Sequence, residues 1–386
     1  MARSALQAFG TSVFSEMTAL ATQHGAVNLS QGFPDFEGPS AIVGAAVAAL
    51  RSGQNQYGRS MGLVPLVEAI ALHQQRCYGI HLDPMTEVCA TAGATEAIAA
   101  AVLGLLEPGD EVLVLEPFYD GYPATLAMAG AVPRVATLRF PDFALPIEEL
   151  RALCTDKTRM LILNNPHNPT GKVLSVDELD ALAALCIERD LWVLSDEVYE
   201  HLVYDGGRHV PLCTRPGMRE RTVTLSSTGK TFSFTGWKVG WATGPAHLIR
   251  GVQAAHQFLT FCAATPLHRA MATALTESSD DFFASLQREY QERRDFLVDT
   301  LRAAGFSVAV PAGAYFCLVD IRPVTSEDDR TFARRLIGEA GVAAIPPSAF
   351  YARDVDEGRH LLRFAFCKKR ATLEEAAQRL RAWHHA

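Results

Sequence analysis

Short apolar segments that read as buried β-strands alternate along most of this chain with longer segments that read as helices. The strand candidates are residues 87–91, 111–116, 131–137, 160–164, 192–195 and 222–225, and the helices between them are expected at 97–106, 122–129 and 175–190. In repeated β-α-β order each helix returns the chain to the end of the sheet where the previous strand began, so the strands are expected to run mostly parallel. The pattern predicts an α/β fold in which a large domain has a mostly parallel sheet between helices.

A second region of different character begins near residue 278. A long helix is expected at 282–304, followed by short strands at 306–310, 315–320, 342–345 and 361–366 and helices at 328–339 and 373–383. This arrangement is typical of a small α+β domain, and an irregular N-terminal arm of about 40 residues is expected to pack against it. A chain of 386 residues is long enough for two domains. We therefore assign 41–277 to the large, ligand-binding domain, and 1–40 with 278–386 to the arm and the small domain.

Composition excludes several classes of function. A net charge of −8 leaves no basic surplus for binding nucleic acid. No apolar run approaches the roughly 20 residues of a membrane span, and the N-terminus lacks the layout of a signal peptide, so we expect a cytoplasmic protein without a membrane partner. The eight cysteines are scattered without a C-x-x-C pair. They are expected to be reduced, largely buried thiols, without disulfides and without a metal site.

Polar residues gather where the predicted strands end. Ligands of open α/β sheets bind at the carboxyl ends of the strands, so residues that follow different strands are expected to share one crevice. The candidates at these ends are Gly93-Ala94-Thr95, Tyr119, Asn168, Asp196 with Tyr199, and Lys230.

The segment 226–240 carries the most specific chemical signal. It places Lys230 in a tight turn among small hydroxyl residues, with Lys238 eight positions further on. A lysine that forms a Schiff base needs a partly desolvated position that favours its neutral amine. A phosphate could be held by Lys238, Ser227 and Thr95 together with the backbone N–H groups where the 93–95 turn opens a helix. A Gly/Ser-rich surface loop with incidental lysines is the alternative interpretation.

The other candidates suit an aromatic cofactor and its substrate. Asp196 could hold a ring nitrogen protonated, Tyr199 could reach a ring oxygen, and Tyr119 could stack on the ring. Asn168 presents an amide in a rigid turn, and Arg363, within an apolar strand, suits a substrate carboxylate. Each has a structural alternative: a cap or ion pair for Asp196, a half-buried or core position for the tyrosines, and an internal salt bridge for Arg363. Together these residues indicate a pyridoxal phosphate site.

Four motifs resemble fold-type I, class I aminotransferases in order and spacing, and the resemblance covers nearly the whole chain. They are Asn165-Pro166-His167-Asn168-Pro169-Thr170-Gly171, Ser195-Asp196-Glu197-Val198-Tyr199-Glu200, residues 226–240, and Leu362-Arg363-Phe364. Segments 30–36, 91–96, 116–120 and 256–258 are most similar to the kynurenine/glutamine/methionine aminotransferase branch.

The resemblance implies a role for each matching residue. Lys230 would bind the cofactor as a Schiff base and move the proton between the substrate Cα and C4′. Asp196 would pair with the pyridine nitrogen, Asn168 and Tyr199 would bond its O3′, and Tyr119 would stack on the ring. The remaining positions are the backbone of Ala94 and Thr95 with Ser227 and Lys238 for the phosphate, Arg363, Asn168 and Gly32 for the substrate carboxylate, and Tyr57 for the phosphate of a neighbouring subunit.

A shared site of that kind implies a homodimer, and the family also implies cis peptide bonds at Glu116-Pro117 and Asn168-Pro169. Two departures from relatives stand out. Gly229 precedes Lys230 where many relatives have Ser or Ala, and Lys238 stands where aspartate-specific members carry Arg. Both also occur in the kynurenine-like branch, so the expected activity is retained.

The expected activity is transfer of the amino group of an L-amino acid to a 2-oxo acid by a ping-pong mechanism. The sequence offers no clear second arginine for a distal carboxylate, which favours methionine, glutamine, aromatic residues or kynurenine as donors. Candidate pocket walls are Phe14, Phe33, Tyr57 and Phe258. A cysteine S-conjugate β-lyase and an N-succinyldiaminopimelate-type aminotransferase remain alternatives. A nucleotide-binding protein lacks the glycine-rich motifs it would need, and a regulator would need a DNA-binding extension for which the chain has no room.

Overall fold

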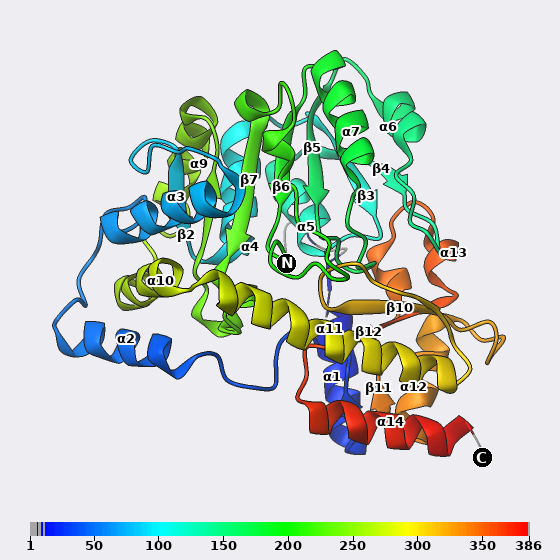
Figure 1. Cartoon of the computed structure of the whole chain (residues 1–386). Helices are drawn as coiled ribbons and strands as arrows, with labels where there is room; N and C mark the ends of the chain where they lie inside the picture. Colours follow the sequence, from blue (N-terminus) through cyan, green and yellow to red (C-terminus); the bar gives the residue numbers. More distant parts are fainter. Residues whose placement is uncertain (1–5, 7–8, 11, 385–386) are drawn as a thin grey trace.

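A seven-stranded sheet forms the centre of the molecule in the computed structural model, which describes residues 6, 9–10 and 12–384 (Figure 1). The strand order is β2-β8-β7-β6-β5-β3-β4. Neighbouring strands from β7 to β4 are parallel, and β8 is antiparallel to both β2 and β7. The predicted α/β class is confirmed. The strands are β2 (Val88–Thr91), β3 (Glu111–Glu116), β4 (Val132–Thr137), β5 (Thr158–Asn164), β6 (Trp192–Asp196), β7 (Thr222–Ser227) and β8 (Gly240–Thr243).

Helices cover both faces of this sheet because its central strands are apolar on both sides. Along β3, Val112 and Val114 belong to one core, whereas Leu113 and Leu115 belong to the core on the opposite face. One face packs against α4, α5 and α9, and the other against α3 and α10 at one end and α6 and α7 at the other. The helices are α2 (Ser40–Arg51), α3 (Val64–Tyr78), α4 (Gly93–Leu105), α5 (Gly121–Ala129), α6 (Ile147–Leu153), α7 (Val176–Glu188), α9 (Ala246–Leu259) and α10 (Thr265–Glu277).

A smaller α+β unit lies below the sheet in Figure 1 and is joined to it by the long helix α11. It has a three-stranded antiparallel sheet, order β12-β10-β9, and a parallel pair, β1-β11. Its elements are α1 (Val13–His24), β1 (Val27–Asn28), α11 (Asp280–Ala303), β9 (Ser307–Ala309), β10 (Phe316–Asp320), α12 (Asp329–Ala340), β11 (Val342–Ala343), α13 (Val355–Gly358), β12 (Leu361–Ala365) and α14 (Arg370–His384). The division at 41–277 remains a proposal, and the positions of both sheets are compatible with it.

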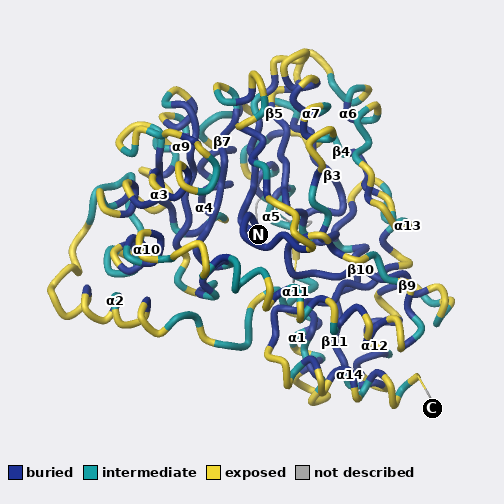
Figure 2. Tube along the Cα trace, viewed as in Figure 1, coloured by how far each residue is buried: buried dark blue, intermediate teal, exposed yellow. Residues whose placement is uncertain are grey.

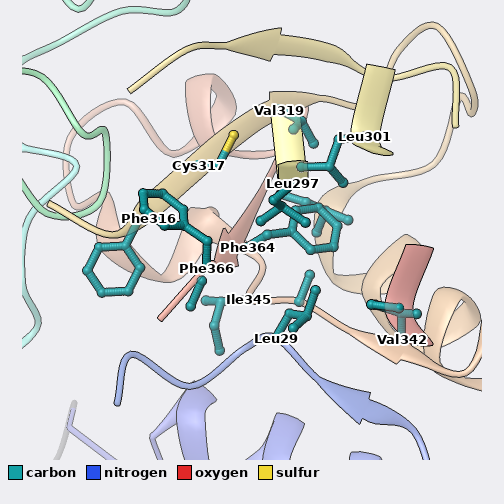
Figure 3. Packing of buried hydrophobic residues seen from close by; sticks show 14 of the residues in the cluster. Leu29, Leu297, Leu301, Phe316, Cys317, Val319, Val342, Ile345, Phe364 and Phe366 are labelled. Carbon is teal, nitrogen blue, oxygen red and sulfur yellow. The ribbon is translucent and has the colours of Figure 1, made fainter. Parts of the chain in front are cut away.

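The core of this unit combines segments that are far apart in the sequence. Figure 3 shows Leu297 and Leu301 of α11 packed with residues of β10 and β12 and with Leu29 near the N-terminus. The same cluster includes Val198 and Tyr199, which follow β6 of the large sheet. The core of the small unit therefore extends to the edge of the sheet where the site was predicted.

The structure corrects the prediction for the N-terminal arm, which is not irregular between residues 13 and 28. Helix α1 begins where the Ser12 hydroxyl accepts a hydrogen bond from the Ser15 amide, and it ends at Gly25, which has φ 59°. Residues 1–5, 7–8 and 11 of the arm lie outside the described residues. The elements β8, α6 and α10 were not predicted. Strand β8 is short and has glycine as its first residue, which weakens the strand pattern.

A capping box opens α7: the Ser175 hydroxyl accepts a hydrogen bond from the Glu178 amide, and the Glu178 carboxylate accepts one from the Ser175 amide. All eight cysteines are free thiols, and most of them are buried. In the described part of the chain, every helix is too short or too polar to cross a membrane.

Candidate active site

A cavity of about 260 Å³ lies at the carboxyl ends of the parallel strands, between the two units of the fold. The crevice predicted from the strand ends is present there. Nearly all predicted site residues line it: Gly32, Ala94, Thr95, Tyr119, Asn168, Asp196, Tyr199, Ser227, Lys230, Lys238 and Arg363. Both peptide bonds expected to be cis, Glu116-Pro117 and Asn168-Pro169, are cis.

Lys230 lies in a single helical turn, α8 (Thr228–Thr231), that begins as β7 ends. The Ser227 hydroxyl caps this turn by accepting a hydrogen bond from the Gly229 amide (3.1 Å). The Lys230 Nζ atom lies 5.7 Å from the ring centre of Tyr199 and 5.5 Å from that of Tyr315. Burial lowers the pKa of Lys230 to about 8. At neutral pH a larger fraction of this lysine is therefore the neutral amine than for a lysine in water. The neutral amine is the form that attacks an aldehyde.

Asp196 is the last residue of β6 and is buried. Its Oδ2 accepts a hydrogen bond from the Tyr122 hydroxyl at 2.7 Å, and its Oδ1 a longer one from the Val198 amide at 3.4 Å. Burial raises the pKa of Asp196 to about 6, although the hydrogen bond from Tyr122 opposes the rise. A buried carboxylate of this kind is stabilised when a cation faces it, such as a protonated ring nitrogen.

Sequence analysis missed two residues that hold this region together. Tyr122 supplies the short hydrogen bond to Asp196, and only its position three residues after Tyr119 could have suggested it. Asn164, at the end of β5, donates from Nδ2 to the Asp196 carbonyl (2.8 Å) and accepts at Oδ1 from the Asn168 amide (2.7 Å). It thereby links the turn that carries Asn168 to the strand that carries Asp196. As a polar residue at a strand end, it matched the rule that found the others.

A donor set suited to a phosphate surrounds the start of α4. Gly93 has φ 78°, a conformation in which only glycine is free of strain, and the amides of Ala94 and Thr95 follow at the helix N-terminus. The Lys238 Nζ donates to the Thr95 hydroxyl at 3.2 Å, and the Ser227 hydroxyl lines the same wall. The cluster thus combines backbone donors, hydroxyls and one ammonium group, as a phosphate requires.

Arg363 projects into the cavity from β12 of the small unit. Its Nη1 donates to Asn168 Oδ1 (3.1 Å) and its Nη2 to the Ser30 carbonyl (3.0 Å), while Nε is buried without a partner. The guanidinium carbon lies 4.1 Å from the ring centre of Phe316. Among the ion pairs between described residues, none joins Arg363 to a carboxylate. The internal salt bridge considered from the sequence is therefore not found, and the guanidinium is available to an anionic ligand.

Gly32 closes the wall beside this arginine. Its carbonyl accepts a hydrogen bond from the Tyr315 hydroxyl at 2.6 Å. A Cβ atom at this position would lie 2.6 Å from the Phe316 ring, so a larger residue would force the segment or the ring to move. Glycine is required here by close approach.

Two of the four aromatic residues proposed as pocket walls line the cavity and two do not. Phe14 and Phe33 line the cavity, but Tyr57 and Phe258 do not line the cavity of their own chain. Tyr57 is 84% exposed and Phe258 is 90% exposed. Tyr57 contacts the edge of the Phe261 ring, with the ring centres 5.3 Å apart.

A separate group of three side chains, two buried and one partly buried, has the residue types of a metal site. His73, Cys77 and His201 can place one ligand atom each within 4.8 Å of one another. In the structure, His73 Nε2 lies 3.1 Å from His201 Nε2 and 3.8 Å from a carboxylate oxygen of Glu200. The expectation that the protein has no metal site stays a prediction.

The cavity combines a buried lysine of lowered pKa, a buried carboxyl and donors suited to a phosphate, a combination that fits a phosphorylated aromatic aldehyde. Comparison with known proteins identifies the class of enzyme. The family model described as "Aminotransferase class I and II" matches residues 24–380. The chain belongs to this family and is an aminotransferase.

Its relatives have several specificities. A protein named "Probable N-succinyldiaminopimelate aminotransferase" from Mycobacterium tuberculosis is 50% identical, over 98% of each chain. The structure of that organism's N-succinyldiaminopimelate aminotransferase superposes with a TM-score of 0.96 at 49% identity, covering 99% of this chain and 100% of that one. A kynurenine–oxoglutarate transaminase from Dictyostelium discoideum is 39% identical over 96% of this chain and 94% of its own length. The methionine aminotransferase of Escherichia coli is 41% identical over 98% and 97%.

Aminotransferases of this family use pyridoxal phosphate, and the residues of the cavity fit that group. The phosphate matches the donors around Gly93, the aldehyde matches the amine of Lys230, and the pyridine nitrogen matches the buried carboxyl of Asp196. The unpartnered Nε of Arg363 leaves hydrogen-bonding capacity for a substrate carboxylate.

Proposed function

We propose that this aminotransferase takes its amino group from L-amino acids with neutral, bulky side chains: methionine, glutamine, aromatic residues or kynurenine. The observation that carries the proposal is the charge of the cavity wall. Three of the described residues that line it are cationic, namely Lys230, Lys238 and Arg363. The first two are assigned to the cofactor, which leaves Arg363 for the α-carboxylate and no further cation for an acidic side chain. The acceptor would be a 2-oxo acid, in a ping-pong cycle of cytoplasmic amino-acid metabolism.

Each residue of the site has a defined task in this proposal. Pyridoxal phosphate, when bound, supplies the electron sink for the bond that breaks at the substrate Cα. Arg363 and Asn168 orient the substrate carboxylate beside Gly32. The Lys230 amine would take the proton from the substrate Cα and return it to C4′ of the cofactor, and its lowered pKa suits a general base. Asp196 would keep the ring nitrogen protonated.

Further contacts with the cofactor are part of the proposal. Tyr199 and Asn168 would hold the ring oxygen O3′, and Tyr119 would stack on the ring. Ala94, Thr95, Ser227 and Lys238 would hold the phosphate.

A second candidate substrate is an N-succinylated diamino acid, favoured by the 50% identity to the Mycobacterium tuberculosis protein over nearly the whole of both chains. This substrate carries further carboxylates, which would need cations beyond those lining the cavity of one chain. β-Elimination from cysteine S-conjugates is a third reaction that the same lysine could support. It is distinguished by its independence from a 2-oxo acid, since elimination needs no acceptor.

A homodimer is part of the proposal, because Tyr57 lies outside its own cavity. Exposed apolar side chains occur along α2 and near the end of α9, including Val43, Val47, Leu50 and Phe258. Figure 2 shows α2 as largely exposed, and beyond its buried stripe of Ile42, Ala46 and Ala49 the helix carries the first three of these apolar side chains on its exposed surface. A second copy covering this face would bury these residues and place Tyr57 near the phosphate of the other subunit.

The test is the absorption spectrum of the purified protein, with Lys230→Ala as the control. A yellow band that disappears with methionine and returns with a 2-oxo acid is expected for the wild type and not for the variant. Rates with methionine, glutamine, phenylalanine, kynurenine and N-succinyldiaminopimelate then rank the donors. A turnover at least tenfold faster with the succinylated substrate than with any neutral donor would overturn the proposed specificity.

A further inference from the structure

Glu96 and His256 form a buried ion pair directly behind the phosphate-binding turn. Glu96 lies in the first turn of α4, one residue after Thr95, and His256 lies near the end of α9. His256 Nδ1 is 2.6 Å from Glu96 Oε1, and the His256 side chain is fully buried. The other carboxylate oxygen of Glu96 accepts a hydrogen bond from the Ala92 amide at 2.5 Å. The pair therefore joins α9 to the backbone that begins the phosphate site.

The hydrogen bonds of His256 require a doubly protonated ring. Its Nε2 lies 2.7 Å from the Ser60 carbonyl oxygen, which can only accept, so Nε2 must carry a proton. Its Nδ1 faces an ionised carboxylate, which also only accepts. Burial alone would lower the pKa of His256, but the hydrogen bond to Glu96 and the charge of Glu96 outweigh it and raise the pKa. Burial opposes ionisation of Glu96, yet the hydrogen bonds from His256 and Ala92 lower the Glu96 pKa overall.

Two further groups lie beside this pair. The Thr260 hydroxyl donates to Glu96 Oε1 at 2.8 Å. The ring of His268 on α10 is close enough for the charges of His256 and Glu96 to act on it, and burial followed by the charge of His256 lowers its pKa to about 4. His268 is therefore neutral at physiological pH, and the positive charge of this cluster resides on His256.

Ser60 and Tyr57 belong to one short segment, residues 56–60. Besides His256, residues between 257 and 265 contact this segment at three other points. The Ser60 hydroxyl donates to Gln257 Oε1 (2.9 Å), and the Thr265 hydroxyl donates to the Gln56 carbonyl (2.9 Å). The ring of Tyr57 packs edge-on against Phe261. Of these contacts, only the one from His256 also reaches the phosphate-binding helix.

We infer that His256 is a positioning residue, which fixes the segment carrying Tyr57 relative to the phosphate-binding turn through its paired hydrogen bonds to Ser60 and Glu96. The inference rests on the proposed homodimer, in which Tyr57 contacts the phosphate of the other subunit. The His256 ring contacts both Ser60, in the Tyr57 segment, and Glu96, behind the phosphate-binding turn. Loss of these hydrogen bonds would displace the Tyr57 segment and so weaken the phosphate site of the partner subunit.

The test is a double-mutant cycle on the affinity for pyridoxal phosphate, measured by titrating the cofactor-free protein. His256→Gln and Tyr57→Phe are each expected to raise the dissociation constant about tenfold, and the double variant no more than the weaker-binding single variant. His247→Gln is the matched control, because His247 is exposed on the same helix. Glu96→Gln, which keeps the size of the side chain, repeats the measurement from the other end of the pair.

Three results would overturn the inference: an unchanged dissociation constant in His256→Gln, effects of His256→Gln and Tyr57→Phe that multiply in the double variant, or no effect of Glu96→Gln. A merely structural role of His256 would give multiplying effects, since general loosening does not depend on the Tyr57 hydroxyl. Failure of the proposed function is distinguishable: a different donor specificity would change the ranking of turnover rates and not this titration, and absence of the homodimer would leave Tyr57→Phe alone without effect on the dissociation constant.

Discussion

Replacing Asp196 with asparagine should stabilise the cofactor-free protein while destroying the enzyme. Burial raises the pKa of this carboxyl from 3.8 to about 6 in the folded chain. Between those two values the unfolded chain has released the proton and the folded chain still holds it, so stability falls as pH rises. At about 1.4 kcal/mol per pH unit, the rise corresponds to about 3 kcal/mol. Asparagine does not titrate and keeps an oxygen for the Tyr122 hydroxyl, so the variant escapes this loss.

The assay is urea unfolding of both cofactor-free proteins at several pH values between 4 and 7. The variant should gain little over the wild type near pH 4 and about 3 kcal/mol above pH 6. Asp299→Asn, which replaces an exposed carboxyl near the end of α11, is the control variant. Adding pyridoxal phosphate should reverse the order, because the ionised Asp196 then faces a cation. A stability difference that is constant with pH would refute the reasoning.

Three smaller predictions follow from single contacts. Tyr122→Phe removes the 2.7 Å hydrogen bond to Asp196. Hydrogen bonds to charged groups contribute about 1.5–3 kcal/mol, so kcat/KM should fall about tenfold or more. An unchanged kcat/KM would contradict the assigned contact. Gly32→Ala places a methyl group against Phe316 and should raise the KM of the amino acid, whereas the affinity for pyridoxal phosphate, titrated separately, should stay the same. Ser175→Ala breaks the capping box of α7 and should lower the free energy of unfolding by about 1 kcal/mol without changing activity; equal stability in urea would show the cap to be unimportant.

The sequence predicted the cavity well because its main residues follow directly after strands. Asp196, Asn168 and Lys230 are polar residues at the ends of apolar strands, so their shared location follows from the parallel sheet. Arg363 could be proposed because a charge inside an apolar strand needs a partner. Its actual contacts with Asn168 and the Ser30 carbonyl depend on how the small unit docks, which no local pattern encodes.

The parts that could not be predicted depend on contacts between distant segments. Glu96 and His256 are 160 positions apart, and neither residue has a sequence context that reveals the other. Strand β8 was missed because only three residues separate Gly240 from Gly244, which is too short a run to distinguish a strand from a loop. Helix α1 was missed even though its capping residues, Ser12 and Gly25, are ordinary helix signals.

The antiparallel pairing of β8 with β7 also determines how far Lys230 and Lys238 can change position relative to each other. Because β8 runs antiparallel to β7, the chain leaves β7 and enters β8 at the same end of the sheet. Lys230 lies at the start of this connection and Lys238 at its end. The lysine proposed to bind the cofactor covalently and the lysine proposed to bind its phosphate therefore belong to one hairpin. Insertions or deletions within 231–237 could shift Lys238 toward or away from Thr95 while Lys230 stays fixed to β7. This hairpin offers a route to retune the enzyme for a cofactor analogue of different length without rebuilding the sheet.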